Sequence, residues 1–250
     1  MKQKRLRIFA GPNGSGKTTI INQIKEKVGA ELPADFFGVY VVNADEIESE
    51  ITRTGSLLLK NFQIATDTNE VQSYFKQSNF SPVKLNDAEL WKKFKIENSA
   101  LFFPASEMNS YVAADIAEFI RQKLLHAGLS FTFETVMSNS SKLDFIKQAK
   151  ENGYRTYLYF IATDDPGINI RRVNFRVSEK GHAVSPEIIT KRYYKSLENL
   201  RQAVLLTNRA YIFDNSGKAS RPVAEITDGH DVKVFDPEKA PAWFVKYLAG

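Results

Sequence analysis

A glycine-rich segment near the start of the chain has the residue types and spacing of a phosphate-binding loop. Within FAGPNGSGKTT (9–19), Gly11, Gly16, Lys17 and Thr18 form the pattern Gly-x-x-x-x-Gly-Lys-Thr. In such a loop the backbone N–H groups surround the β- and γ-phosphates, the lysine neutralises them, and the hydroxyl binds Mg²⁺. The predicted ATP-binding residues are therefore Gly11, Pro12, Asn13, Gly14, Ser15, Gly16, Lys17, Thr18 and Thr19, with Thr18 as the metal ligand.

Two carboxylates follow apolar runs that are predicted to end at the same sheet edge as this loop. Asp45 closes the run 37–45, and Glu134 lies near the end of the run 131–135. Phosphoryl transfer needs a carboxylate that orients or deprotonates the acceptor, which makes Asp45 a candidate catalytic residue. The structural alternatives are a helix N-cap at Asn43 or Asp45 and, for Glu134, a carboxylate bonded to loop backbone.

A basic segment after the fourth apolar run is a candidate lid. In INIRRVNFRVSEKGHAV (168–184), Arg172 and Arg176 are four residues apart, so in a helix both point the same way and can close over a triphosphate. The predicted lid spans about 165–185. The alternative is an ordinary solvated helix face.

The elements that must position these residues alternate between strand and helix. Strand-like runs occupy 6–11, 37–45, 131–135, 154–163 and 210–216, and helical patterns occupy 18–29, 111–128, 141–153 and 186–208. Near-continuous apolar strands separated by helices indicate a parallel sheet covered on both faces. We expect an α/β fold of the P-loop NTPase type, with about five strands and ligands at their carboxyl ends. The tail from Ser220 is predicted to form a short strand or hairpin and then a helix.

Residues 54–108 are too long for a plain connection and contain helical fragments, so we expect a helical insertion within a single domain spanning 1–250. It is either a solvated elaboration or a cap over the substrate.

Composition narrows the class of protein. No apolar stretch reaches the roughly 18 residues of a membrane span, and the absence of cysteine excludes disulfide bonds and thiolate catalysis. We therefore expect a cytoplasmic protein. The net charge of +5 fits a cleft for anionic small molecules, because the basic residues are scattered apart from a group between Arg171 and Arg201. Nucleic acid is the less favoured partner.

Six segments, in order, resemble the zeta toxin family of P-loop phosphotransferases. They are AGPNGSGKTT, VVNADEI, FTFETVMS, RRVNFRVSEKGHAV, RYYKSLENL and YIFDNSG, spread over most of the chain apart from the insertion and the tail. Zeta toxins phosphorylate the sugar of UDP-N-acetylglucosamine and are blocked by an antitoxin partner. The resemblance implies that Lys17 serves the ATP phosphates and Asp45 is the general base. It also implies that Glu134 holds the acceptor and that Arg172 and Arg176 form the lid.

Two features depart from the family pattern. Glu134 is followed by TVMS rather than by a Gly-Thr-Leu-Arg-like run, and the second lid arginine of the toxins aligns near His182, which competes with Arg176 for that role. The favoured function is an ATP- and Mg²⁺-dependent kinase of a small hydroxyl-bearing acceptor such as a nucleotide sugar. The alternatives are an NTPase or nucleic-acid-end kinase with a basic acceptor groove, and a catalytically idle ATP-binding module.

Overall fold

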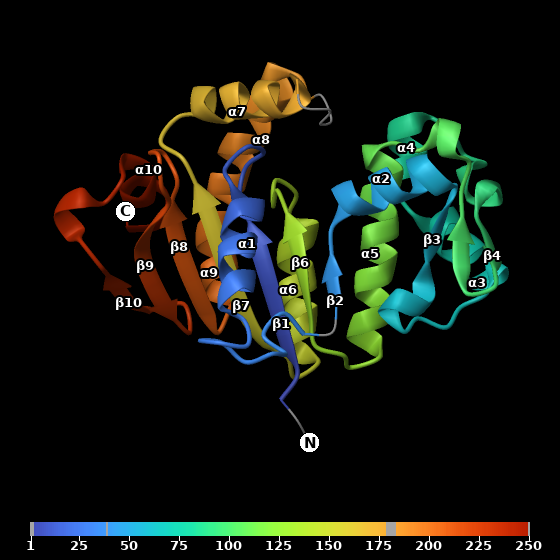
Figure 1. Ribbon diagram of the computed structural model, residues 1–250, viewed down its shortest axis with the longest axis horizontal. Coiled ribbons are helices and arrows are strands. Elements are labelled where there is room, and N and C mark those ends of the chain that lie inside the picture. The colour runs from blue at the N-terminus through green and yellow to red at the C-terminus, as the bar shows by residue number, and fades with distance from the viewer. Residues whose placement is uncertain (1–2, 39, 179–183, 250) are drawn as a thin grey trace. The chain divides into compact units, whose positions relative to one another are not determined.

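A mostly parallel sheet flanked by helices forms the first of two units of the chain (Figure 1). The computed structural model describes residues 3–38, 40–178 and 184–249. The first unit comprises Met1–Gly38 and Thr132–Gly250, and the second comprises Val39–Phe131.

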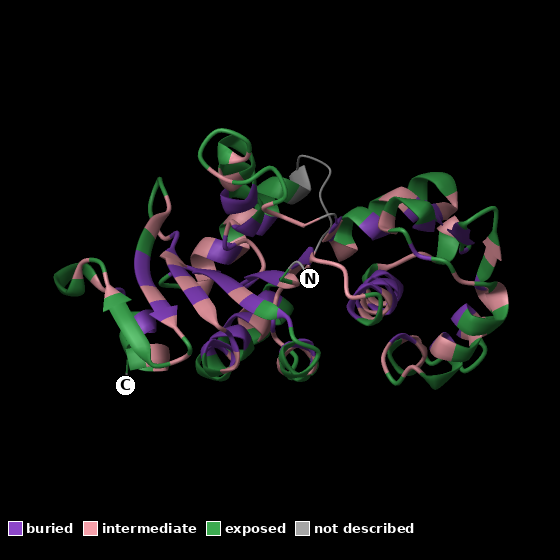
Figure 2. Ribbon diagram, turned by 90° about the horizontal axis from the view of Figure 1, so that it is seen from below, coloured by how far each residue is buried: buried purple, intermediate pink, exposed green. Residues whose placement is uncertain are grey.

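The sheet of the first unit is built on strands that are buried along most of their length. Its order is β10-β9-β8-β7-β1-β6. The strands are β1 (Arg5–Ala10), β6 (Phe131–Thr135), β7 (Arg155–Ala162), β8 (Arg209–Asp214), β9 (Arg221–Thr227) and β10 (Asp231–Val234). Strands β1, β7 and β8 run parallel, whereas β9 and β10 continue the sheet antiparallel. Continuous burial in β1 and β7 is typical of parallel strands covered on both faces (Figure 2).

Helices cover both faces of this sheet. Its helices are α1 (Lys17–Lys27), α6 (Ser141–Glu151), α7 (Pro166–Ser178), α8 (Pro186–Glu198), α9 (Leu200–Leu206) and the short α10 (Ala242–Phe244). Side chains alternate along each strand, so Phe9 and Tyr159 face α1 and pack with Ile20 and Ile21. Figure 1 shows α1 in front of the sheet and α6 and α9 behind it.

The second unit is a small α+β assembly around one buried helix. Its elements are β2 (Tyr40–Val42), α2 (Ala44–Thr54), β3 (Ser56–Leu58), α3 (Thr68–Gln77), α4 (Ser81–Leu85), β4 (Lys95–Glu97), β5 (Ala100–Phe102) and α5 (Ser110–His126). Helix α5 buries ten of its 17 residues. Strands β3, β5 and β4 form an antiparallel sheet in that order.

The α/β fold with a mostly parallel, helix-flanked sheet is confirmed, and all five predicted strands are present. The hairpin β9–β10 extends the sheet beyond them. The helix predicted over 186–208 is interrupted at Asn199, where α8 ends and α9 begins. The sequence indicated only helical fragments in 54–108, whereas this segment also carries the sheet β3-β5-β4. Among the described residues, none of the helices has the length and apolar content needed to cross a membrane.

Candidate active site

The glycine-rich segment forms a tight loop between β1 and α1, with backbone angles that favour glycine. Gly11, Gly14 and Gly16 have φ of 144°, 71° and 94°. A Cβ added to Gly11 would lie 2.0 Å from the carbonyl oxygen of Ile161, and one added to Gly16 would lie 2.1 Å from Asn215 Nδ2. Both the conformation and the lack of space therefore require glycine.

The start of α1 provides positive charge at this loop. Gly16 is the N-cap and no acidic residue occupies the first turn, so nothing on the helix itself offsets the positive end of its dipole. Lys17 is buried, and its ammonium group donates to the carbonyls of Gly11 and Pro12 at 3.0 and 3.1 Å. Thr18 and Thr19 are exposed at the helix start. This arrangement is suited to bind an anion at the helix N-terminus.

Glu134 on β6 lies beside the lysine of the loop. Its Oε1 atom is 3.8 Å from Lys17 Nζ, and its side chain is 13% exposed. The ammonium group of Lys17, which is suited to bind phosphates, and the carboxylate of Glu134 thus lie together near the ends of two strands. This arrangement was expected from the sequence.

Two buried polar atoms of the loop, Asn13 Oδ1 and Ser15 Oγ, have no hydrogen-bond partner among the described residues. Ser15 is fully buried, and within the part of the chain that the structure describes its hydroxyl makes no hydrogen bond. Buried polar groups are rarely left unsatisfied. Together with the glycine turns and the helix N-terminus, this orphan hydroxyl fits a loop that takes a polar ligand such as a nucleotide phosphate.

Helix α7 begins on top of this loop and carries the two predicted lid arginines. A Cβ on Gly14 would meet the carbonyl oxygen of Asn169 at 2.6 Å and Val173 Cγ2 at 3.1 Å, so the first turns of α7 pack directly on the loop. Arg172 donates to the carbonyls of Asn215 and Gly217 at 2.8 and 3.2 Å. Arg176 is exposed. It follows Asn169 and Val173 at helical spacing, on the face that meets the loop.

Two predicted residues are not part of the first unit's described residues, Asp45 and His182. Asp45 belongs to the second unit, in the first turn of α2, and its side chain is exposed. Asn43 is the N-cap of that helix, since its Oδ1 accepts the N–H of Asp45 at 2.9 Å. Of the two residues proposed for the cap, Asn43 therefore fills it. His182 lies outside the described residues.

Two residues that contact the loop were missed by the sequence reading, although both stand in segments that it quoted. Asn169 donates to the carbonyl of Asn13 at 2.6 Å, and Asn215 donates to that of Ser15 at 2.8 Å. The available signal in the sequence was an asparagine that follows an apolar strand run. This signal does not predict which group the amide of the asparagine binds.

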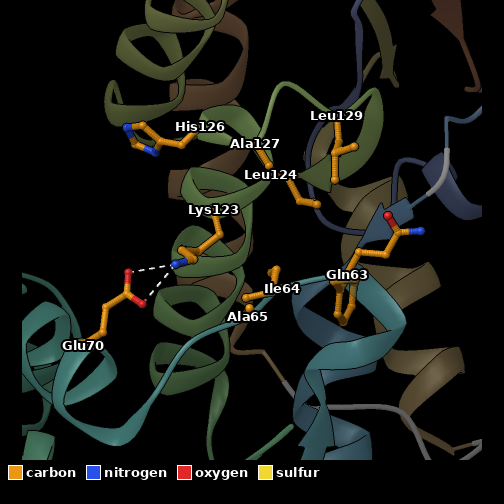
Figure 3. A pocket seen from close by; sticks show the side chains of 10 residues that line it. Gln63, Ile64, Ala65, Glu70, Lys123, Leu124, His126, Ala127 and Leu129 are labelled. Carbon is orange, nitrogen blue, oxygen red and sulfur yellow. Dashed lines mark hydrogen bonds and ion pairs between the residues drawn. The ribbon is translucent and has the colours of Figure 1, made fainter.

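The second unit also has a cavity of about 340 Å³, beside α5 (Figure 3). Its lining includes an ion pair in which Lys123 contacts both carboxylate oxygens of Glu70, at 2.8 and 3.0 Å. Hydrogen bonds from Lys123 and Thr66 hold the pKa of Glu70 below its usual value. None of the predicted site residues lines this cavity. Because its charges already neutralise each other, we assign it no role in catalysis.

Comparison with known proteins finds a family model that matches just under half of the chain. Residues 99–221 match the family model described as Zeta toxin. This part of the chain is similar to the zeta toxin family. The family resemblance read from the sequence motifs is thus confirmed for a zeta toxin region that contains Glu134, Arg172 and Arg176. The phosphate loop and Asp45 precede the matched residues.

Solved structures and one further relative resemble the zeta toxin-like chain more distantly. The AvrRxo1-ORF1:-ORF2 structure with ATP aligns at a TM-score of 0.56 and 16% identity, covering 94% of this chain and 62% of that one. The native AvrRxo1-ORF1:-ORF2 complex gives a TM-score of 0.57 at 16% identity, covering 99% and 66%. These similarities show a shared fold, and this chain spans about two thirds of those longer chains.

A structure of the PezAT toxin-antitoxin system of Streptococcus pneumoniae aligns at a TM-score of 0.48 and 18% identity, covering 86% of this chain and 69% of that one. A protein of Haemophilus influenzae described as uncharacterized is 34% identical over 65 residues, which are 26% of this chain and 46% of that protein.

Proposed function

We propose that the protein is an ATP-dependent kinase that transfers the γ-phosphoryl group to a hydroxyl of a small acceptor. The observation that carries the proposal is the 3.8 Å approach of Lys17 Nζ to Glu134 Oε1 beside the glycine loop. The ammonium group of Lys17 is suited to bind the phosphates of ATP, and the carboxylate of Glu134 is suited to bind a polar acceptor. A carboxylate beside the phosphate-binding lysine would repel the phosphates of a bound nucleotide. A site that only bound nucleotide would therefore not need one.

In this proposal the loop and the start of α1 bind ATP. The backbone of Gly11–Thr19 and the end of the helix dipole hold the β- and γ-phosphates, and Lys17 exchanges the carbonyls of Gly11 and Pro12 for phosphate oxygens. Thr18, exposed at the helix start, would hold Mg²⁺ by its hydroxyl. When bound, the ion supplies charge neutralisation of the phosphates.

Asp45 is the proposed general base, which takes the proton of the acceptor hydroxyl. Its exposed carboxylate is not used as a helix cap, because Asn43 has that role. Glu134 is proposed to bind the acceptor, so the two carboxylates have different tasks.

Arg176 is the proposed lid arginine that contacts the transferring phosphoryl group. It is exposed and follows the docked face of α7, whereas the guanidinium of Arg172 already bonds two backbone carbonyls. Arg172 would therefore act on phosphate only after leaving these carbonyls. His182 stays the competing candidate for the second lid contact.

We further propose that the acceptor is a nucleotide sugar of the UDP-N-acetylglucosamine type, and that an antitoxin protein controls the enzyme in the cytoplasm. The zeta toxin match over 99–221 supports both ideas, and the AvrRxo1-ORF1:-ORF2 structures supply a fold relative solved with ATP and as a two-protein complex.

The test is to incubate the wild-type protein and Asp45→Asn with γ-labelled ATP, Mg²⁺ and UDP-N-acetylglucosamine or other nucleotide sugars. The proposal expects label on one sugar with the wild type, and about 10²-fold less with Asp45→Asn. Transfer to oligonucleotide ends instead would favour a nucleic-acid-end kinase. ATP binding without any labelled product would favour an idle binding module.

A further inference from the structure

Building on the proposed ATP site, we propose that Asn169 and Asn215 are positioning residues that hold the carbonyls of the phosphate loop turned away from the nucleotide. A loop that directs its N–H groups at phosphates must direct its carbonyls outward, and buried carbonyls need donors. The structure provides these donors from two distant parts of the chain.

Asn169 supports the first half of the loop. Its amide donates to the carbonyl of Asn13 at 2.6 Å, and its side chain is fully buried. The orientation of this amide is fixed from behind, because its Oδ1 accepts the hydroxyl of Thr163. The carbonyl of Thr163 in turn accepts the hydroxyl of Tyr193 at 2.6 Å. Burial raises the pKa of Tyr193, so its hydroxyl stays protonated and remains a donor.

Asn215 supports the second half of the loop. Its amide donates to the carbonyl of Ser15 at 2.8 Å, directly before the helix that carries Lys17. The backbone of Asn215 is itself fixed, since its N–H donates to the carbonyl of Ala162 at 2.8 Å. The side chain fills the space where a Cβ on Gly16 would lie, which explains why this position must be glycine.

Arg172 links the two supports. It lies one turn after Asn169 on α7 and donates to the carbonyl of Asn215 at 2.8 Å. Three hydrogen bonds, from Asn169 to Asn13, from Arg172 to Asn215 and from Asn215 to Ser15, therefore join the loop, helix α7 and the end of β8. The backbone of the loop and of α7 closes this set of contacts into a ring. These contacts fix the conformation of the loop before ATP binds, so the loop loses less conformational freedom on binding.

The proposal is tested with Asn169→Ala, Asn169→Asp, Asn215→Ala and Asn215→Asp, by titrating Mg·ATP and by measuring urea unfolding. Aspartate keeps the size of the side chain but replaces its donor by an acceptor. At position 169, aspartate can also still accept the hydrogen bond from the Thr163 hydroxyl. Asn169→Asp can therefore be measured even if Asn169→Ala does not fold. We expect each folded variant to bind Mg·ATP about tenfold more weakly, with Asp no better than Ala.

Asn208→Ala is the matched control. Asn208 also joins β7 to β8 through its side chain, accepting from the N–H and hydroxyl of Thr156 at 3.0 and 3.1 Å, but at the opposite end of these strands from Asn215. It should lower the urea midpoint and leave Mg·ATP affinity unchanged. A purely structural role for Asn169 and Asn215 predicts this same pattern for their variants.

The outcomes separate this inference from the proposed function. A wild-type protein that does not bind Mg·ATP contradicts the proposed function itself. A wild-type protein that binds, together with Asp variants that bind equally well, overturns only the positioning role.

Discussion

Replacing Gly14 by alanine should separate the loop from α7 and weaken nucleotide binding. Gly14 has φ of 71°, so alanine there carries a strain of about 1 kcal/mol. The added Cβ would also lie 2.6 Å from the carbonyl oxygen of Asn169, whereas ordinary contact begins at 3.4 Å. Because that neighbour is helix backbone, loop and helix must move apart by about 0.8 Å. The bond from Asn169 to Asn13, at 2.6 Å, cannot survive this movement with good geometry.

Gly55→Ala provides a control with the same strain. Gly55 has φ of 72°, and a Cβ there meets nothing within 4 Å. In urea unfolding followed by circular dichroism, Gly55→Ala should lose about 1 kcal/mol and Gly14→Ala at least as much. In Mg·ATP titrations only Gly14→Ala should weaken binding, by about tenfold or more. If both variants bound Mg·ATP like the wild type, the packing of α7 on the loop would not matter for the nucleotide.

Four further substitutions test the roles of the predicted site residues. Lys17→Ala should cost about 3 kcal/mol or more of transition-state stabilisation, and wild-type turnover of ATP would disprove its role. Asp45→Asn should retain ATP affinity and the cap at Asn43 while phosphoryl transfer falls about 10²-fold; unchanged transfer would assign Asp45 to structure. Arg176→Ala should lower kcat more than it raises the ATP KM, which steady-state kinetics would show. Arg172→Ala should instead weaken ATP binding, because it breaks the contact with Asn215.

The parts of the fold that depend on local patterns could be predicted from the sequence. The strands around Phe9 and Tyr159 are largely apolar runs, and the loop that starts at Gly11 is defined by glycine spacing. The placement of Glu134 beside Lys17 followed from the rule that parallel strands end at one edge.

Features that depend on distant contacts could not be predicted. Asn169 and Asn215 bind loop residues 156 and 200 positions away in the chain, and no local pattern specifies such a pair. The strands β3, β4 and β5 have three residues each, too few to show an alternation. At the helix break, the side chain of Asn199 donates to the distant carbonyl of Met137 at 2.9 Å.

The central claim is that this chain transfers the γ-phosphoryl group of ATP to a small compound that carries a hydroxyl group. A metabolite extract provides the most direct test. The extract is incubated with γ-labelled ATP and either the wild-type protein or Lys17→Ala, and mass spectrometry identifies every compound that gains a phosphoryl group. The account predicts one phosphorylated small molecule, with the mass gain on a hydroxyl, that is absent with Lys17→Ala. ATP consumed with only free phosphate released, or a product equally abundant with Lys17→Ala, would contradict it.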